Sequence, residues 1–222
     1  MPFLAIALSY VLSSISFPWL IARMYGVDLR TTGARKLGGS NLVKTVGVVP
    51  GITGGVLDGL KGLAAVLIAR ALGLSLEAQL LCGLAAIVGQ MWPLFHRFDG
   101  GRANATGWGF AIAADPTAAF LFMGPPVYLA VAARLLIKPR PTRVLPIAAL
   151  VSFVVFPVAV LARDGATATA FAGSAAFVLI EVRRLTAGLR EDLATGAPIG
   201  RILTNRALYD RSELQVRGVV AI

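Results

Sequence analysis

Two glycine-rich, basic stretches of the sequence could bind a phosphorylated substrate. The first covers residues 33–41 (GARKLGGSN) and the second covers residues 98–106 (FDGGRANAT). Glycines let backbone amides turn toward an anion, and Arg and Lys side chains supply positive charge. Each stretch precedes a predicted helix, and the first helix is expected to begin near Ser40 or Asn41, which are good N-cap residues. A flexible basic loop would explain either stretch alone, but two on one face of the protein favour anion binding.

A pair of charges and a group of serines could also take part in chemistry. Asp58 and Lys61 lie three positions apart within a long apolar segment, so they share one helix face and can pair. Charges inside a membrane mark either a functional site or a self-neutralising structural pair. Near the end of the first apolar segment stand Ser13, Ser14 and Ser16, whose hydroxyls could contact a substrate or bond to their own backbone.

The composition indicates that a membrane positions these residues. Of the 222 residues, 57% are hydrophobic and only 14% are charged, and the mean hydropathy is +0.77. A soluble domain is about half apolar and about a quarter charged, so this chain has too little polar surface to cover a soluble globule. The net charge of +10 fits the cytoplasmic loops of a membrane protein, so we expect the lipid bilayer and not nucleic acid as a partner. The lone Cys82 excludes a disulfide within the chain, and no metal or cofactor is expected.

The apolar segments predict an all-α integral membrane protein with about seven transmembrane helices. A spanning helix needs about 20 apolar residues, with about 17 as a lower bound. Six segments are read as full spans, at residues 1–22, 45–69, 78–95, 117–136, 144–162 and 165–180. A shorter one, residues 103–114, completes the seven, and a kink is expected at Gly124-Pro125-Pro126.

The basic residues predict the orientation. With the N-terminus outside, most of the 21 basic residues, including Arg140 and Arg143, fall in cytoplasmic segments. The chain then divides into a membrane domain, residues 1–182, and a basic cytoplasmic C-terminal tail, residues 183–222. That tail holds either an amphipathic helix near residues 200–217 or a frayed end.

In their order along the chain, these stretches resemble the bacterial acyl-phosphate:glycerol-3-phosphate acyltransferases of the PlsY type. The resemblance runs from about Tyr10 to Pro116 and is looser over the later spans. It implies seven helices in the bacterial inner membrane, an outward N-terminus and an active site that opens to the cytoplasm. It also implies transfer of an acyl chain from acyl phosphate to glycerol 3-phosphate, giving lysophosphatidic acid for phospholipid synthesis, without a metal or an acyl-enzyme.

The resemblance assigns roles to individual residues. Ser14 and Arg30 fall on positions that the family requires, and we expect them to be catalytic. The substrate phosphate would be bound by both glycine-rich stretches and by the segment at residues 57–62 (LDGLKG), through Gly33, Gly38, Asn41, Lys61, Gly100, Gly101, Arg102 and Thr106.

The chain also departs from the family pattern. Arg35 stands at a glycine of the family's second motif, and its side chain would obstruct a close approach of the backbone to a ligand. The other departures are Ala34 and Lys36 beside it, Gln90 in place of a His, Asp99 and Arg102 each in place of a Lys, and residues 185–188 in place of a polar motif.

These departures leave two other functions open. A catalytically impaired paralogue could bind a lipid phosphate or act together with a true acyltransferase. A small transporter is a further possibility, although the sequence has no half-to-half repeat. The main prediction is acyl transfer, in which positioning and charge stabilisation of an already activated donor supply most of the rate.

Overall fold

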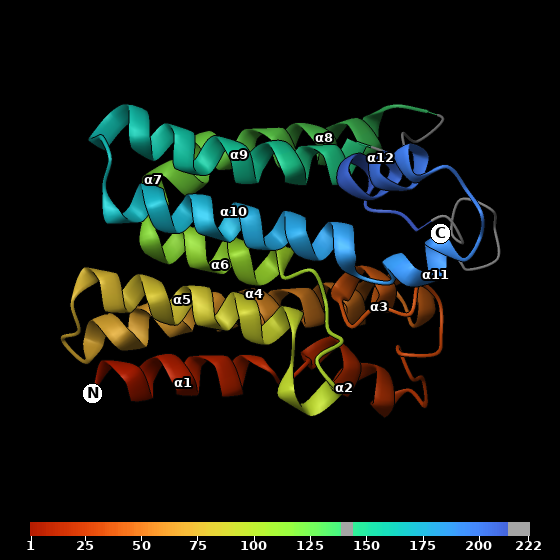
Figure 1. Cartoon of the computed structure of the whole chain (residues 1–222), viewed down its shortest axis with the longest axis horizontal. Coiled ribbons are helices and arrows are strands. Elements are labelled where there is room, and N and C mark those ends of the chain that lie inside the picture. Colours follow the sequence, from red (N-terminus) through yellow and green to blue (C-terminus); the bar gives the residue numbers. More distant parts are fainter. Residues whose placement is uncertain (139–143, 213–222) are drawn as a thin grey trace.

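The computed structural model describes residues 1–138 and 144–212, and these residues form helices and loops without a strand (Figure 1). Arg140, Arg143 and the end of the predicted helix at residues 200–217 lie outside the described residues. The helices are α1 (Pro2–Ser13), α2 (Phe17–Met24), α3 (Gly39–Thr45), α4 (Val48–Ala71), α5 (Leu76–Met91), η1 (Leu94–His96), α6 (Asn104–Ala114), α7 (Pro116–Ala118), η2 (Ala119–Met123), α8 (Gly124–Leu136), α9 (Val144–Asp164), α10 (Ala168–Thr186), α11 (Leu189–Leu193) and α12 (Ile199–Tyr209).

The long helices run alongside one another, and α2, α3, α11 and α12 gather at one end of the bundle (Figure 1). Five helical stretches in the described part of the chain are long and apolar enough to cross a membrane. They are Pro2–Met24, Val48–Ala71, Leu76–His96, Pro116–Leu136 and Val144–Asp164. The predicted all-α architecture is confirmed, whereas the count of seven spans and the outward N-terminus stay predictions.

Two of the predicted spans, now α6 and α10, are not among the helices long and apolar enough to cross a membrane. Both lie among the longer helices of the bundle (Figure 1). α6 has only 11 residues, in agreement with the short segment that the sequence predicts. α10 carries Glu181, Arg183 and Arg184 in its last turns, where the helix reaches the end of the bundle that holds α11 and α12.

The first predicted span is two helices rather than one. α1 ends at Ser13, and α2 begins at Phe17. Ser16 caps α2, because its hydroxyl accepts a hydrogen bond from the Trp19 amide. Pro18 stands in the first turn of α2, where the N–H that it lacks would have no helical partner. The predicted span at residues 1–22 therefore matches the helical stretch Pro2–Met24, with a break after Ser13 that the sequence did not predict.

A π-helix precedes the prolines of the fourth long stretch, where the sequence predicts a kink. α8 begins at Gly124, and Pro125 and Pro126 lie in its first turn. The preceding residues, 119–123, form a π-helix. A proline cannot donate to a carbonyl in the turn before it, and the wider π turn accommodates that loss.

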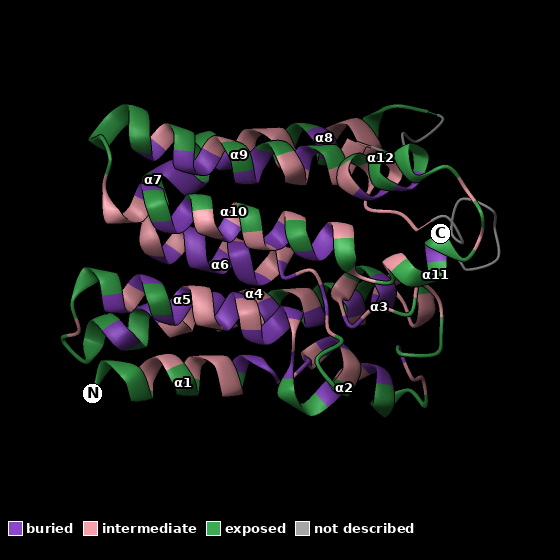
Figure 2. Ribbon diagram, in the orientation of Figure 1, coloured by how far each residue is buried: buried purple, intermediate pink, exposed green. Residues whose placement is uncertain are grey.

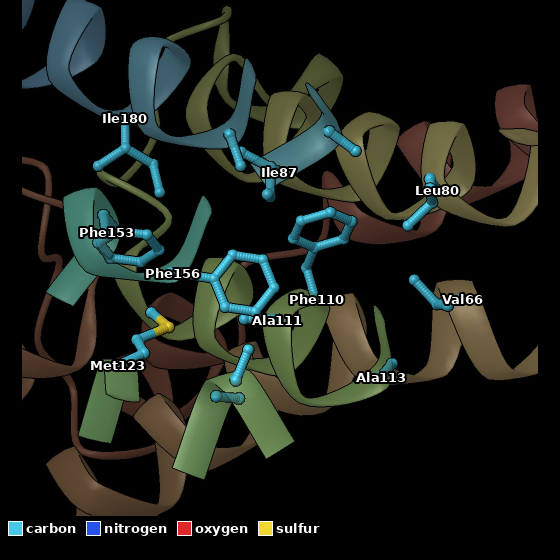
Figure 3. Packing of buried hydrophobic residues seen from close by; sticks show 14 of the residues in the cluster. Val66, Leu80, Ile87, Phe110, Ala111, Ala113, Met123, Phe153, Phe156 and Ile180 are labelled. Carbon is cyan, nitrogen blue, oxygen red and sulfur yellow. The ribbon is translucent and has the colours of Figure 1, made fainter. Parts of the chain in front are cut away.

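Burial follows the expected pattern for a chain in lipid. Buried residues concentrate where helices face one another, and exposed ones lie on the outward faces (Figure 2). The main core packs aromatic and aliphatic side chains of α6, α9 and α10 together, among them Phe110, Phe153, Phe156 and Ile180 (Figure 3). Many of the exposed side chains are large and apolar, which suits contact with lipid.

The closest helix contact in the bundle joins α4 to α6 through glycines. A Cβ atom at Gly62 would collide with the Thr106 carbonyl oxygen, and one at Gly109 would collide with the Gly59 carbonyl oxygen. Small residues allow helix backbones to approach this closely in a membrane. The approach brings Thr106 to Asp58, whose backbone carbonyl accepts a hydrogen bond from the threonine hydroxyl at 2.9 Å.

We predict that Gly109→Ala destabilises the protein by about 2 kcal/mol, because the added methyl group must push α4 and α6 apart. The midpoint of unfolding in one detergent measures this change. Gly55→Ala on α4 is the control, since a Cβ there meets no atom within 4 Å. Equal losses of stability in the two variants would contradict the role of close packing.

Candidate active site

The two glycine-rich stretches meet in one cavity of about 320 Å³. Residues 36–40 line it from the first stretch, and residues 100–106 line it from the second. Asp58 on α4 and Gln90 on α5 lie in the same lining, and Asp210 reaches it from beyond α12. The cavity therefore combines the two segments that together predicted anion binding.

The structure separates the ten predicted site residues into two groups. The residues that line the cavity are Gly38, Gly100, Gly101, Arg102 and Thr106. Those outside its lining are Ser14, Arg30, Gly33, Asn41 and Lys61.

The Asn41 side chain holds the first glycine-rich loop in shape. Its Oδ1 accepts a hydrogen bond from the Ala34 amide at 2.8 Å. Its Nδ2 lies within 3.1 to 3.3 Å of three loop carbonyl oxygens, those of Leu29, Thr32 and Lys36. Asn41 is 1% exposed, so its side chain is committed to the loop backbone.

The helix after this loop begins earlier than predicted. α3 starts at Gly39 with Gly38 as its N-cap residue and without a side-chain cap, so the expectation of a cap at Ser40 or Asn41 was wrong. Gly33 is needed upstream, because its φ is +62° and a Cβ there would collide with the Asn41 side chain.

Arg35 adopts a left-handed backbone conformation that is usual for glycine. Its φ of 53° lies in the left-handed region that glycine favours, at a cost of about 1 kcal/mol. Its side chain is exposed, whereas the ammonium group of the next residue, Lys36, lies in the cavity lining. Arg35 therefore stands in a backbone conformation that a glycine would adopt at lower cost.

The second loop is clamped by Arg183, which the sequence analysis did not select as a site residue. Its guanidinium donates to the Gly100 carbonyl oxygen at 3.0 Å and to the Gly101 carbonyl oxygen at 3.3 Å. It also pairs with the Asp99 carboxylate at 2.6 Å and lies 5.8 Å from the centre of the Trp92 ring. The charge reversal at Asp99 thus has a partner. No local signal in the sequence points to this contact, because Asp99 and Arg183 lie 84 positions apart.

Asp58, Lys61 and Gln90 form a polar cluster inside the bundle. The predicted pair is confirmed, with the Lys61 Nζ 2.9 Å from the Asp58 Oδ1. The same Nζ donates to the carbonyl oxygens of Ser13 at 3.0 Å and Ile15 at 2.7 Å, where α1 ends, and also contacts Gln90 Oε1. Gln90 Nε2 donates to the Asp58 carboxylate at 2.8 Å. Lys61 therefore joins α1, α4 and α5.

The predicted catalytic pair, Ser14 and Arg30, makes contacts with the protein itself. The Ser14 hydroxyl is buried and donates to the Tyr10 carbonyl oxygen of its own helix at 2.9 Å. The Arg30 guanidinium donates two hydrogen bonds to the Asp28 carboxylate, from Nε to Oδ1 at 3.0 Å and from NH2 to Oδ2 at 2.6 Å. These hydrogen bonds hold the pKa of Asp28 well below its usual range. Arg30 also lies 5.5 Å from the centre of the Trp19 ring.

An apolar groove of about 320 Å³ lies on the other side of the polar cluster, between α1 and α4. Lys61, Ser13 and Ile15 line it near the break after α1, and Ala5 and Leu72 line it far from that break. Small alanines of α4, at positions 64, 65 and 69, leave much of the space. The cluster thus divides a polar cavity from an apolar one.

Comparison with known proteins identifies the family. The model of the family described as glycerol-3-phosphate acyltransferase matches residues 3–190. The glycerol-3-phosphate acyltransferase of Rubrobacter xylanophilus is 39% identical over 158 residues, which cover 71% of this chain and 75% of that protein. That of Synechococcus sp. is 32% identical over 192 residues, which cover 83% of this chain and 92% of that one.

Solved structures agree with this match. The crystal structure of PlsY (YgiH), an integral membrane glycerol 3-phosphate acyltransferase, in its glycerol 3-phosphate form superposes with a TM-score of 0.73 at 25% identity over 98% of each chain. Its lysophosphatidic acid form gives 0.71 at 26% identity, covering 88% of this chain and 92% of that one. A sequence match over most of the chain and a shared fold show that this chain belongs to the glycerol-3-phosphate acyltransferase family.

Proposed function

We propose that this protein transfers a fatty acyl group from acyl phosphate to glycerol 3-phosphate in the cell membrane and so forms lysophosphatidic acid. The observation that carries the proposal is the meeting of both glycine-rich stretches in one basic cavity beside an apolar groove. Membership of the family supports glycerol 3-phosphate as the acceptor. The choice of acyl phosphate as the donor rests on the PlsY-type resemblance.

The substrate phosphate would bind in the polar cavity. Arg102 and Lys36 supply positive charge there, and the turns at Gly38, Gly100 and Gly101 bring backbone close to the ligand. A volume of about 320 Å³ is of the size that small-molecule sites have. The acyl chain would lie in the apolar groove between α1 and α4, on the lipid side of the polar cluster.

The reaction needs little covalent chemistry from the protein. The first hydroxyl of glycerol 3-phosphate attacks the acyl carbon, a new C–O bond forms, and the phosphate leaves with the electron pair of the bond that breaks. The hydroxyl proton passes to a phosphate oxygen. Positioning of the two substrates and stabilisation of the developing charge by Arg102 and Lys36 then supply most of the rate. Ser14 and Arg30 keep a proposed catalytic role through the resemblance alone.

The contacts around the departing residues argue against a catalytically impaired paralogue. Arg35 holds a left-handed conformation of the kind that glycine favours, and Asp99 is paired with Arg183. Gln90 hydrogen-bonds to Asp58 and contacts Lys61, so its amide takes a full part in the polar cluster. The loops thus keep their shape despite the altered side chains, which favours an active enzyme.

We predict that Arg102→Met lowers kcat/KM for glycerol 3-phosphate by about 100-fold, because it removes a cation from the phosphate site. Arg102→Lys should keep most of the activity, since the charge remains. Formation of lysophosphatidic acid from palmitoyl phosphate by purified protein in lipid nanodiscs measures both variants. Arg190→Met, an exposed arginine on α11, is the control. Failure of folded wild-type protein to form product with any of several acceptors would refute the proposed function.

We also predict that anion binding weakens as the pH rises through neutrality. Burial and the neighbouring Arg102 lower the pKa of Lys36 to about 7. Lys36 is charged below that pH and neutral above it, so its attraction for an anion is lost as the pH rises. Sulfate is a suitable probe because its charge is constant in this range. Wild-type protein should bind sulfate several-fold more tightly at about pH 6 than at about pH 8.5.

The matched variant for this experiment is Lys36→Met. It should bind sulfate more weakly than the wild-type protein at the lower pH, and its affinity should change little between the two pH values. An equally steep pH dependence in Lys36→Met would assign the titration to another group.

A further inference from the structure

The C-terminal part of the chain returns to the polar cavity and places a carboxylate on its cations. Asp210 follows the last residue of α12 and lines the cavity. Its side chain forms an ion pair with Arg102. Its backbone carbonyl oxygen accepts hydrogen bonds from Arg102 at 3.2 Å and from the Lys36 ammonium at 3.4 Å. The guanidinium of Arg184 lies 3.9 Å from the same carboxylate.

Two buried arginines hold α12 in the position that delivers Asp210. Arg206 is fully buried and donates to the Asp192 carboxylate at 2.7 Å and to the Gly188 carbonyl oxygen at 2.6 Å. Arg184 is also fully buried and donates to the Ala207 carbonyl oxygen at 3.0 Å. Buried arginines with these partners fix α12 against the end of α10, so the approach of Asp210 to the cavity is built into the fold.

The Asp210 residue is bound to Arg102 and Lys36, the two cations to which the proposed function assigns the substrate phosphate. Arg102 has 8% of its side chain exposed, and Asp210 has 22%. A phosphate that binds Arg102 and Lys36 would meet the negative charge of Asp210 at the same groups. Two anions cannot share one partly buried guanidinium without repulsion, so the carboxylate has to leave before the phosphate can bind.

Release of Asp210 has to break its contacts with Arg102 and Lys36, and it can leave the anchor of α12 in place. The residue lies just past the helical residues of α12, at a left-handed φ of 53°. The buried contacts of Arg206 lie a full turn earlier, so they can stay in place while Asp210 swings away from Arg102. The helix therefore serves as a fixed anchor, and the residue that follows it, Asp210, serves as the movable group.

We infer that Asp210 is a tethered competitor that holds the phosphate site closed until a phosphorylated substrate displaces it. This inference rests on the proposed function for the identity of the substrate, and it adds a form of regulation by the tail. The family match ends at residue 190, so the competitor belongs to a part of the chain outside that match.

Competition by Asp210 should weaken the apparent affinity for phosphate by a predictable factor. A site that is free in only a fraction of the molecules shows an apparent Kd raised by the inverse of that fraction. If Asp210 occupies the site in about nine-tenths of the molecules, Asp210→Asn lowers the apparent Kd about tenfold. The same variant should lower KM for glycerol 3-phosphate by a similar factor, and kcat should not fall.

The experiment uses the full-length protein in lipid nanodiscs and inorganic phosphate as the first probe. Asp210→Asn should bind phosphate about tenfold more tightly than wild-type protein. Glu191→Gln removes the same charge from an exposed tail position on α11 and should leave the affinity unchanged. An unchanged or weakened affinity in Asp210→Asn, or an equal gain in Glu191→Gln, would overturn the inference.

A second measurement uses the wild-type protein alone, so it does not depend on whether a variant folds. Trypsin cleavage after Arg211 reports whether the adjacent Asp210 is held in the cavity. Saturating phosphate should accelerate this cleavage in the wild-type protein, because the displaced residue carries Arg211 into solvent. Cleavage that phosphate does not accelerate would overturn the inference, whatever the behaviour of Asp210→Asn.

These measurements distinguish failure of the inference from failure of the proposed function. Phosphate binding and tail cleavage require no acyl transfer, so both can support the competitor in a protein that makes no lysophosphatidic acid. Conversely, acyl transfer by wild-type protein together with an unchanged phosphate affinity in Asp210→Asn would refute the competitor and leave the function intact.

Discussion

A single buried ammonium group, that of Lys61, supports both cavities of this protein. It donates to the carbonyl oxygens of Ser13 and Ile15 at the break in the first span, which would otherwise lack a helical partner there. It also balances the charge of Asp58, which would otherwise be unpaired inside the bundle. Because these contacts join α1, α4 and α5, the wall between the polar cavity and the apolar groove depends on them.

The two glycine-rich loops are stabilised in the same way. In each, a buried polar side chain from outside the turn binds to several backbone carbonyl oxygens: Asn41 in the first loop and Arg183 in the second. The loops can therefore hold left-handed residues other than glycine, including Arg35 and Ala103. These contacts therefore offset the cost of left-handed residues at positions where the chain lacks glycine.

Local patterns predicted the helical segments, the short α6 and the Asp58–Lys61 pair, because hydropathy and helical spacing act over a few residues. The break after Ser13 was not predicted, since the segment has no charged residue and the contact that completes the break comes from Lys61, 46 positions away from Ile15. The clamp of Arg183 on Asp99 joins residues 84 positions apart, and the approach of Asp210 to Arg102 joins residues 108 apart. No local pattern carries such pairings. The division into a membrane domain, residues 1–182, and a tail, residues 183–222, stays a prediction.

The separation of a polar cavity from an apolar groove has a consequence for how this protein meets its reactants. With the proposed substrates, the acceptor arrives from a three-dimensional aqueous solution, whereas the donor arrives by lateral diffusion within one leaflet. The relevant concentration of the donor is then its mole fraction in the bilayer, not its amount per volume of water. If inert lipid is added while the total amount of donor stays constant, the mole fraction of donor in the bilayer falls. The reaction rate should then fall as if donor had been removed, although nothing in the aqueous phase has changed.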